Sequence, residues 1–222
     1  MSNVPTGAVL REIYERLWST YGPQHWWPAE TPTEIVVGAI LAQNTAWTNV
    51  ERAIDNLKAA ECLTWEALCD VSDERLIDLI RPAGTYRIKA ARLKTFVHML
   101  WEDHGGSLDS LLTGDLDHAR SRLLAVNGVG PETADSILLY AAGRLTFVVD
   151  AYTKRILRRH RIIDHDADYE TVRQLFQRAV TPEPQVYNEY HALLVFVGKH
   201  HCRARARCAG CPLESMPHDE DG

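Results

Sequence analysis

LLAVNGVGPETADSILLYAAG, residues 123–143, decides the fold, because it places two glycines in a short turn between two apolar segments. Gly128 and Gly130 flank Val129, and glycine both permits positive φ and lets another backbone approach closely. Pro131 follows, and proline is favoured in the first turn of a helix. The pattern predicts two helices joined by a turn whose exposed amides suit an anion such as a phosphate. A tight helix–helix connection that needs glycine for steric reasons alone would give the same local pattern.

Hydrophobic periodicity is helical along nearly the whole chain. Apolar residues recur every three or four positions in the segments 34–57, 74–80, 90–100, 132–142 and 172–180. Start signals agree with this pattern: Thr31 can cap a helix that begins at Pro32, with Glu34 reaching back, and Ser72 precedes an acidic first turn. No alternating run is long enough to predict a sheet. The sequence therefore predicts an all-α protein of about ten short helices.

Length and composition predict a folded protein with one sizeable domain or two small ones. The chain has 222 residues, of which 45% are hydrophobic, enough to bury a core. It contains no apolar run of about 18 residues, and its start has no charged leader followed by an apolar segment. We therefore expect neither a signal peptide nor a membrane span, and a cytoplasmic protein.

The charge distribution permits local contact with a polyanion. The net charge of −6 at pH 7 argues against indiscriminate polyanion binding. The basic residues are nevertheless grouped, and each group is either a solvated helix surface or part of a basic face. The groups are Arg81, Arg87, Lys89, Arg92 and Lys94; Lys154, Arg155, Arg158 and Arg159; and Arg203, Arg205 and Arg207.

The longer run LLAVNGVGPETADSILLYAAGRLTFVVDAYTKRILRRH, residues 123–160, resembles the helix-hairpin-helix and following aspartate of the endonuclease III, or HhH-GPD, superfamily of DNA glycosylases. The resemblance covers roughly residues 10–213. It implies a two-lobed all-α fold in which a helical barrel domain, residues 32–146, ends in the hairpin. Residues 1–31 and 147–222 would form the second helical lobe, which includes the C-terminal cysteine loop.

Asp150 is the residue that the resemblance identifies as catalytic. From its position alone, directly before a helical stretch, Asp150 is also a good helix N-cap, and the two roles are compatible. A carboxylate at a helix N-terminus is favoured in its ionised form. That form can support an oxocarbenium-like sugar or orient an attacking water while a glycosidic bond is cleaved.

Glu132 marks a departure from the family pattern. In members that both remove the base and cut the strand, a lysine stands at this position and forms a Schiff base with the sugar. Its absence implies a monofunctional base-excision-repair glycosylase that uses water and leaves an abasic site. Two alternatives remain: a bifunctional glycosylase and abasic-site lyase for oxidised pyrimidines, and a non-catalytic DNA-binding module.

The resemblance also implies which residues contact DNA. The hairpin amides would hold a phosphate, and Gln43 would enter the space that a flipped nucleotide leaves. Thr85 stands where many relatives carry a bulky apolar wedge before the tyrosine. The full set expected to contact DNA is Gln43, Thr85, Tyr86, Gly128, Val129, Gly130, Thr133 and Arg155. We therefore expect the partner to be double-stranded DNA with damaged bases, bound by a cytoplasmic, nucleoid-associated monomer.

Three tryptophans are candidates for a base pocket. Trp26 and Trp27 are adjacent in HWWP, and Trp47 lies in LAQNTAWTNVE. The adjacent indoles could simply anchor the N-terminal segment on the core. They could also form a stacking wall, since an indole face attracts a positively charged alkylated purine by cation–π interaction. The two segments resemble the bacterial endonuclease-III-like 3-methyladenine DNA glycosylases, which implies alkylated purines such as 3-methyladenine as substrates.

Three of the five cysteines, Cys202, Cys208 and Cys211, lie close together near the end of the sequence. In a reducing compartment such a group suggests a metal rather than disulfides. Endonuclease III relatives commonly have a fourth cysteine at the position of Pro217 and bind a [4Fe–4S] cluster through four thiolates. The resemblance therefore implies such a cluster, with one of the usual ligands missing.

Histidines next to these cysteines keep three possibilities open. His218 follows Pro217, and His200 and His201 precede Cys202. A histidine could complete a Cys₃His site for zinc, or a cluster with one unusual ligand. A metal-free loop is the third possibility. In each case the arginines between the cysteines could contact phosphates.

Overall fold

The computed structural model describes residues 6–219 of the chain. Over this range the regular structure is entirely helical, with twelve α-helices, one 3₁₀ turn, one π-helical turn and no strand. The prediction of an all-α protein is therefore confirmed. The α-helices are more numerous than expected because some, such as α4 (Trp65–Asp70) and α7 (Leu108–Leu112), are too short to show an apolar repeat.

The helices form two units. The terminal unit comprises Met1–Pro28 and Leu145–Gly222, and the central unit comprises Ala29–Arg144. The boundaries inferred from the sequence, at residues 32 and 147, lie a few residues further along the chain.

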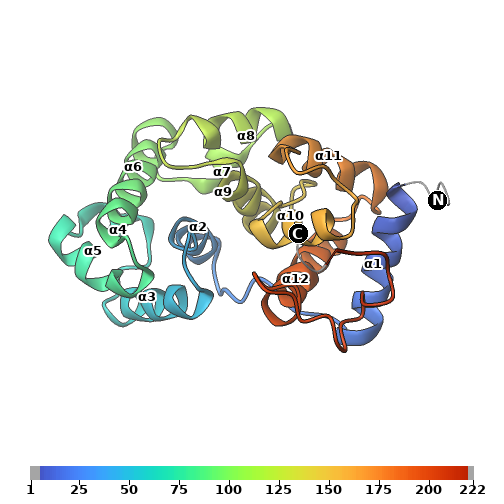
Figure 1. Ribbon diagram of the computed structural model, residues 1–222. Coiled ribbons are helices and arrows are strands. Elements are labelled where there is room, and N and C mark those ends of the chain that lie inside the picture. The colour runs from blue at the N-terminus through green and yellow to red at the C-terminus, as the bar shows by residue number, and fades with distance from the viewer. Residues whose placement is uncertain (1–5, 220–222) are drawn as a thin grey trace. The chain divides into compact units, whose positions relative to one another are not determined.

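The central unit has α2 at its core. Its other elements are α3 (Trp47–Ala59), α4, α5 (Asp73–Leu79), η1 (Arg81–Ala83), α6 (Tyr86–His104), α7, α8 (Leu116–Ala125), α9 (Pro131–Ser136) and η2 (Ile137–Ala141). Helix α2 (Pro32–Leu41) packs against α3, α6, α9 and η2 (Figure 1). It buries Val36, Val37, Ile40 and Leu41 completely, and a helix that is apolar on all sides belongs in a core.

Side-chain caps begin the helices of this unit where the sequence predicted them. Thr31 caps α2, because its side chain accepts a hydrogen bond from the N–H of Glu34 at 3.2 Å. The Glu34 carboxylate reaches back further than a capping box requires, since its Oε2 accepts from the N–H of Glu30 at 3.0 Å. Ser72 caps α5 through the N–H of Arg75 at 3.2 Å.

The terminal unit contains α1 (Thr6–Tyr21), α10 (Ala151–Arg159), α11 (Tyr169–Ala179) and α12 (Pro184–His200). Helix α12 packs against α10 and α1, and α1 packs against α11 (Figure 1). In the core, the rings of Phe147 and Phe176 stack at 3.8 Å with an interplanar angle of 4°. The hydroxyl of the fully buried Tyr190 donates to the carbonyl of Leu10 at 2.7 Å, so a hydrogen bond joins α12 to α1 inside an apolar core.

Helices α10 and α12 approach closely at Gly198. A β-carbon at this position would lie 2.6 Å from Cβ and Cγ of Tyr152, far inside van der Waals contact. The guanidinium carbon of Arg155 lies 5.0 Å from the centroid of the same Tyr152 ring. Because residue 198 has no side chain, the aromatic ring fits between the two helices.

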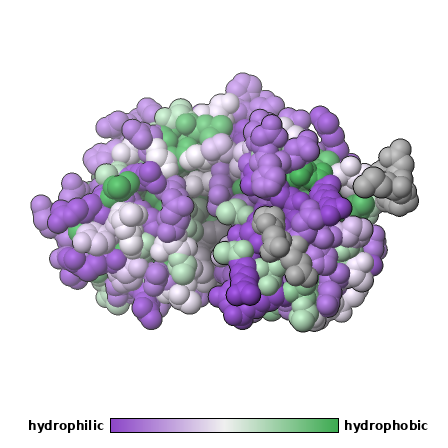
Figure 2. Space-filling view, in the orientation of Figure 1, coloured by the Kyte–Doolittle hydropathy of each residue, from purple (hydrophilic) through white to green (hydrophobic). Residues whose placement is uncertain are grey.

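No helix within residues 6–219 is both long enough and apolar enough to cross a membrane. The face drawn in Figure 2 is mostly hydrophilic, with small and separate hydrophobic areas. The large apolar side chains exposed in the described chain are Trp18, Ile88, Leu124 and Leu145. Scattered apolar residues of this kind are normal on the surface of a folded protein.

Replacing Gly198 with alanine should lower the free energy of unfolding by about 2 kcal/mol, because the new methyl group overlaps the Tyr152 ring in a packed interface. Urea titration followed by far-UV circular dichroism measures the change. Gly7→Ala is the matched control, since a β-carbon there would make an ordinary contact of 3.4 Å with Ala179. Equal stability of the two variants would contradict the close approach of α10 and α12.

Candidate active site

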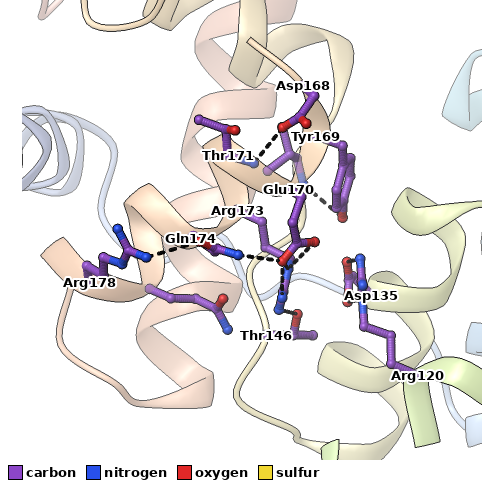
Figure 3. A network of polar contacts seen from close by, with 12 residues as sticks. Arg120, Asp135, Thr146, Asp168, Tyr169, Glu170, Thr171, Arg173, Gln174 and Arg178 are labelled. Atoms are coloured by element: carbon purple, nitrogen blue, oxygen red, sulfur yellow. Dashed lines mark hydrogen bonds and ion pairs between the residues drawn. The ribbon is translucent and has the colours of Figure 1, made fainter. Parts of the chain in front are cut away.

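The segment that leads to Asp150 is held by helix α11. Arg173 of α11 donates from Nη1 to the hydroxyl of the buried Thr146 at 3.2 Å (Figure 3). Arg173 is itself fixed by Glu170, whose carboxylate oxygens accept from Nε at 3.1 and 3.2 Å. The stacking of Phe147 on α11 adds an apolar contact one residue later. The chain is therefore fixed in position just before it reaches Asp150.

Asp150 is the N-cap of α10, so this part of the sequence prediction is confirmed. Its Oδ1 accepts a hydrogen bond from the N–H of Thr153 at 2.7 Å. Its Oδ2 makes no hydrogen bond within residues 6–219 and lies 3.8 Å from Nε2 of His191. The side chain of Asp150 is 11% exposed. One carboxylate oxygen is thus fixed by the helix, while the other is available to a ligand.

His191 of α12 is a neighbour of Asp150 that the sequence analysis missed. Burial lowers the pKa of His191, and the Asp150 carboxylate opposes that shift. The ring is therefore neutral at pH 7, and it meets Phe147 edge-on with 6.5 Å between the ring centroids. A neutral imidazole at this place adds no positive charge beside the Asp150 side chain.

The predicted hairpin is present as α8, a turn and α9. A bidentate ion pair joins the two helices, in which Nε and Nη2 of Arg120 donate to the carboxylate oxygens of the buried Asp135 at 2.9 and 3.0 Å (Figure 3). Paired contacts between a guanidinium and a carboxylate are strong and directional. Pro131 is the first residue of α9, as the sequence predicted.

The two hairpin glycines meet different requirements. A β-carbon at Gly128 would lie 2.7 Å from Cδ of Arg92, and φ at Gly128 is +92°, so both packing and backbone require glycine. A β-carbon at Gly130 would meet no atom within 4 Å, and φ there is −89°. Neither packing nor backbone conformation therefore requires glycine at residue 130. A bare backbone at this place suits close approach by an external ligand.

The turn also offers hydrogen-bond donors. The amides of Gly128 and Gly130 have no acceptor within residues 6–219, whereas the N–H of Val129 donates to the carbonyl of Val126 at 3.0 Å. The side chain of Val129 is buried and anchors the turn. No side chain caps α9 at its N-terminus. These amides together form a surface that suits an anion.

Gln43 follows α2 and contacts the hairpin directly. Its Nε2 donates to the carbonyl of Gly128 at 3.0 Å and to the hydroxyl of Thr133 at 2.9 Å. Its Oε1 accepts a hydrogen bond from Nη1 of Arg92. The structure thus brings together Gln43, Gly128 and Thr133, which the sequence analysis named, with Arg92, which it left among the basic surface residues.

Thr85 and Tyr86, two more of the predicted DNA contacts, lie elsewhere in the central unit, as does Trp47, the third tryptophan proposed for the base pocket. Thr85 is exposed at the start of α6 and has a left-handed backbone conformation with φ of +40°. Tyr86 is half-buried, with the guanidinium carbon of Arg81 at 5.0 Å from its ring centroid. The indole Nε1 of Trp47 donates to the carboxylate of Glu51 at 2.8 Å.

Lys89 connects the loop of Thr85 to the end of α2. Its buried amine donates to the carbonyls of Ala83 and Leu41 at 2.7 and 2.8 Å. Burial, together with the positive charge of the nearby Arg92, lowers the pKa of Lys89 to about 8. The amine is therefore less basic than an ordinary lysine, but it is enclosed by the protein.

The chain has few lysines, and the amines of most of them contact carboxylate or carbonyl oxygens of the protein. The sequence contains five, and the amines of Lys58, Lys89, Lys94 and Lys154 each contact a carboxylate or a carbonyl of the chain. Lys199 is exposed at the end of α12 and makes no such contact within residues 6–219. Position 132 holds an exposed glutamate.

Trp26 and Trp27 belong to a segment of the terminal unit that α12 holds. Both indoles are half-buried, with ring centroids 5.1 Å apart and planes at 51°. The buried carboxylate of Glu189 accepts from the N–H of Gln24 at 2.7 Å and from the N–H of His25 at 3.3 Å. These bonds fix the chain directly before the two tryptophans.

Arg155, which was predicted to contact DNA, binds backbone carbonyls of the terminal unit instead. Its Nε donates to the carbonyl of Cys202 at 2.7 Å, and its Nη2 donates to the carbonyl of Gly198 at 3.2 Å, so it caps the C-terminal end of α12. The predicted site residues therefore fall into two groups. Trp26, Trp27, Asp150 and Arg155 belong to the terminal unit, and Gln43, Trp47, Thr85, Tyr86 and the hairpin residues belong to the central unit.

The three C-terminal cysteines are half-buried and line one cavity of the terminal unit. Burial raises the pKa of the Cys211 thiol. Nη1 of the buried Arg159 lies 3.4 Å from Sγ of Cys202. Within residues 6–219, no three His, Cys, Asp or Glu side chains converge closely enough to hold a single metal ion.

Two of the residues that the sequence analysis missed share a signal. Glu189 and His191 interrupt the apolar run of α12 and are both buried. Polar residues inside such a run are rarely buried without a specific partner, so their position could have identified them. Arg92 had no comparable signal, since its contact with Gln43 joins segments far apart in the sequence.

Comparison with known families agrees with this geometry. Residues 37–182 match the family described as HhH-GPD superfamily base excision DNA repair protein. A Methanocaldococcus jannaschii protein that carries the name of a DNA repair glycosylase is 47% identical over 209 residues, which are 94% of this chain and 95% of that protein. Endonuclease III of Bacillus subtilis is 30% identical over 186 residues, 83% of this chain and 80% of the enzyme.

Solved structures share the fold. The 3-methyladenine DNA glycosylase MagIII of H. pylori, bound to 1,N6-ethenoadenine, has a TM-score of 0.76 and 25% identity, and the match covers 88% of this chain and 98% of that one. A non-covalent complex of endonuclease III with DNA has a TM-score of 0.82 and 22% identity over 98% of this chain and 97% of the enzyme. The chain therefore belongs to the HhH-GPD superfamily of base excision DNA repair proteins and is a DNA glycosylase of the endonuclease III-like type.

Proposed function

We propose that this chain is a monofunctional glycosylase that removes alkylated purines, such as 3-methyladenine, from duplex DNA and leaves an abasic site. Asp150 is the catalytic carboxylate in this proposal. One observation carries it: Asp150 caps a helix N-terminus through Oδ1, while its Oδ2 makes no hydrogen bond within residues 6–219, in a chain that has Glu132 where lyase members of the family have lysine.

The reaction needs a carboxylate in its ionised form. As the bond from the sugar to the base breaks, that carboxylate stabilises the positive charge on the sugar or accepts a proton from the attacking water. The oxygen of the water joins the sugar, and the base leaves with the bonding electrons. In this structure the amide of Thr153 donates a hydrogen bond to Oδ1 of Asp150, which fixes the orientation of that carboxylate.

The lysines of the chain favour water over an amine as the nucleophile. Lys89 has a lowered pKa, which is typical of reactive amines, but its amine is buried and donates to two carbonyls. Lys58, Lys94 and Lys154 are engaged with carboxylates or carbonyls. Within the described chain, Lys199 alone remains as a candidate amine nucleophile. A test of the monofunctional mechanism must therefore include a variant of Lys199.

Three observations support an alkylated purine as the substrate. Such a base already carries a positive charge and is a good leaving group, so a site with one carboxylate suffices. Trp26 and Trp27 provide indole faces in the same unit as Asp150, and indoles attract cationic rings. The similar solved structure from H. pylori is a 3-methyladenine DNA glycosylase that holds a modified adenine.

We infer that the hairpin holds the DNA backbone. The amides of Gly128 and Gly130 and the N-terminus of α9 are the donors for a phosphate in this proposal. On DNA binding, the Gln43 side chain would give up its hydrogen bonds to Gly128 and Thr133 and enter the space left by the flipped nucleotide.

Incubation of the purified protein with methylated duplex DNA should release free 3-methyladenine, and strand breaks should appear only after alkali treatment. Chromatography of the released bases and gel analysis with and without alkali measure the two results. Breaks without alkali on oxidised DNA, with no methylated base released, would move the assignment to a lyase. Failure to release any base from either DNA under single turnover would favour the non-catalytic module.

Borohydride trapping separates the two enzymatic alternatives. A Schiff base gives a covalent protein–DNA adduct, whereas hydrolysis by water gives none. If an adduct did form, Lys199→Met would show whether the exposed Lys199 supplies the amine of the Schiff base. Lys154→Met is the control, because the amine of Lys154 donates a hydrogen bond to a backbone carbonyl.

Asp150→Asn should lower the single-turnover rate of base release by about 10²–10⁴-fold and leave DNA affinity largely unchanged. The free energy of unfolding should change by less than about 0.5 kcal/mol, because asparagine is also a good N-cap. Asp168→Asn is the matched control, since Asp168 caps α11 through the N–H of Thr171 at the same distance of 2.7 Å. Full excision by Asp150→Asn would exclude the catalytic role.

Gly130→Ala should fold with nearly unchanged stability but bind duplex DNA about tenfold more weakly, because its methyl group would stand where a phosphate approaches. Fluorescence anisotropy with a labelled duplex at fixed salt measures the affinity. Gly7→Ala, in the terminal unit, should bind DNA like the wild type. Wild-type affinity of Gly130→Ala would show that the turn does not hold the DNA backbone.

A further inference from the structure

The side-chain amide of Gln43 is held at both of its ends within the central unit. Its nitrogen Nε2 donates to the carbonyl of Gly128 at 3.0 Å and to the hydroxyl of Thr133 at 2.9 Å, and its oxygen Oε1 accepts from Nη1 of Arg92. A backbone carbonyl only accepts hydrogen bonds and a guanidinium only donates them, so these partners decide which end of the amide carries the oxygen. Arg92 therefore sets the orientation of the side chain that the proposed function sends into the duplex.

The side chain of Arg92 has two separable contacts. Its stem passes beside the bare backbone of the hairpin turn, where a β-carbon at Gly128 would lie 2.7 Å from Cδ of Arg92 and 3.0 Å from its Nε. Its guanidinium, within residues 6–219, makes no hydrogen bond or ion pair other than the one to Gln43. The stem thus packs on the turn, while the charged end is committed to one amide oxygen.

Helix α6, which carries Arg92, is fastened to the residues that lead to Gln43. Lys89 lies one turn before Arg92, and its buried amine donates to the carbonyls of Ala83 and Leu41 at 2.7 and 2.8 Å. Leu41 is the last residue of α2, two positions before Gln43. Residues three apart in a helix lie on the same face, so Lys89 and Arg92 face the same segment. Lys89 fixes the backbone before Gln43, and Arg92 fixes the side chain.

Ordering a glutamine side chain costs conformational entropy, because the chain has several rotatable bonds. Here the folded protein already orders Gln43, so insertion into DNA starts from a fixed conformation. Insertion breaks the two bonds of Nε2 to the hairpin. The bond from Arg92 to Oε1 involves neither hairpin acceptor, and nothing else in the described chain holds the guanidinium by a hydrogen bond or ion pair.

We propose that Arg92 is a positioning residue for Gln43: it keeps its hydrogen bond to Oε1 while Nε2 leaves the hairpin, and so directs the amide nitrogen toward the DNA. This inference rests on the insertion of Gln43 in the proposed function. Arg92 acts only through Gln43 and makes no DNA contact of its own in this role. Its loss should therefore slow base release without weakening the binding of undamaged duplex.

Arg92→Met tests this inference, because methionine keeps an apolar stem beside Gly128 and removes the guanidinium. Single-turnover release of 3-methyladenine should fall about tenfold, while the affinity for undamaged duplex, measured by fluorescence anisotropy, should stay within about twofold of the wild type. Arg92→Lys can still donate to Oε1 and should recover part of the lost rate. Far-UV circular dichroism checks that each variant is folded.

A second readout does not depend on base excision. A duplex with a tetrahydrofuran abasic analogue opposite 2-aminopurine reports insertion, since a side chain that enters the gap changes the stacking and fluorescence of 2-aminopurine. The fluorescence change seen with the wild type should persist in Arg92→Lys and diminish in Gln43→Ala and Arg92→Met. Arg178→Met is the matched control, because Nη2 of Arg178 donates to Oε1 of Gln174 at 3.1 Å within α11 of the terminal unit, and it should behave like the wild type.

The double variant decides whether Arg92 acts through Gln43. Adding Arg92→Met to Gln43→Ala should cause no further loss of rate or fluorescence change. A further loss would show that Arg92 acts on DNA directly, and this would overturn the proposal. Wild-type rate and fluorescence in Arg92→Met, with both reduced in Gln43→Ala, would also overturn it and leave the proposed function intact.

Two other outcomes concern the proposed function. An unchanged fluorescence response in Gln43→Ala would exclude the insertion of Gln43, and the positioning role of Arg92 would be excluded with it. If the wild type released no 3-methyladenine but the fluorescence changes followed the expected order, the alkylated-purine substrate would be wrong. The role of Arg92 would still be supported in that case.

Discussion

The hydrogen bond from the amide of Thr153 to Oδ1 of Asp150 is the interaction on which the terminal unit depends. It starts α10, and it fixes one oxygen of the carboxylate, while the other makes no hydrogen bond in the part of the chain that the structure describes. Helix α10 then passes α12 at the point where Gly198 leaves room for an aromatic ring. Further along the same helix, Arg155 and Arg159 bind backbone carbonyls near the cysteine cavity. One short helix thus positions the candidate catalytic group at its start and two arginines beside the cysteine cavity near its end.

Features that depend on local chemistry could be predicted from the sequence. Caps at Thr31, Ser72 and Asp150 follow from side chains that satisfy amides three residues further on, and the structure has each of them. The hairpin follows from a glycine turn and a proline that begins a helix. The all-helical fold follows from apolar spacing. None of these depends on which distant segment packs nearby.

Long-range contacts could not be predicted in the same way. The sequence gives no sign that Arg92 would bind Gln43, or that Arg173 would hold Thr146. Basic residues that read as solvated surface, such as Lys89 and Arg159, are buried and bind carbonyls. Their long apolar stems allow this, because only the end of the side chain needs polar partners. Charge pattern alone therefore does not separate a surface helix from a helix that uses its cations internally.

Lysine is scarce in this chain, where only five of the 24 lysine and arginine residues are lysines. Removing a base exposes a latent aldehyde in the abasic sugar, and aldehydes condense with free amines. Guanidinium groups stay protonated and hold phosphates through paired hydrogen bonds without reacting in this way. A glycosylase whose positive charge resides mainly on arginine can therefore stay close to its product without becoming covalently attached to it.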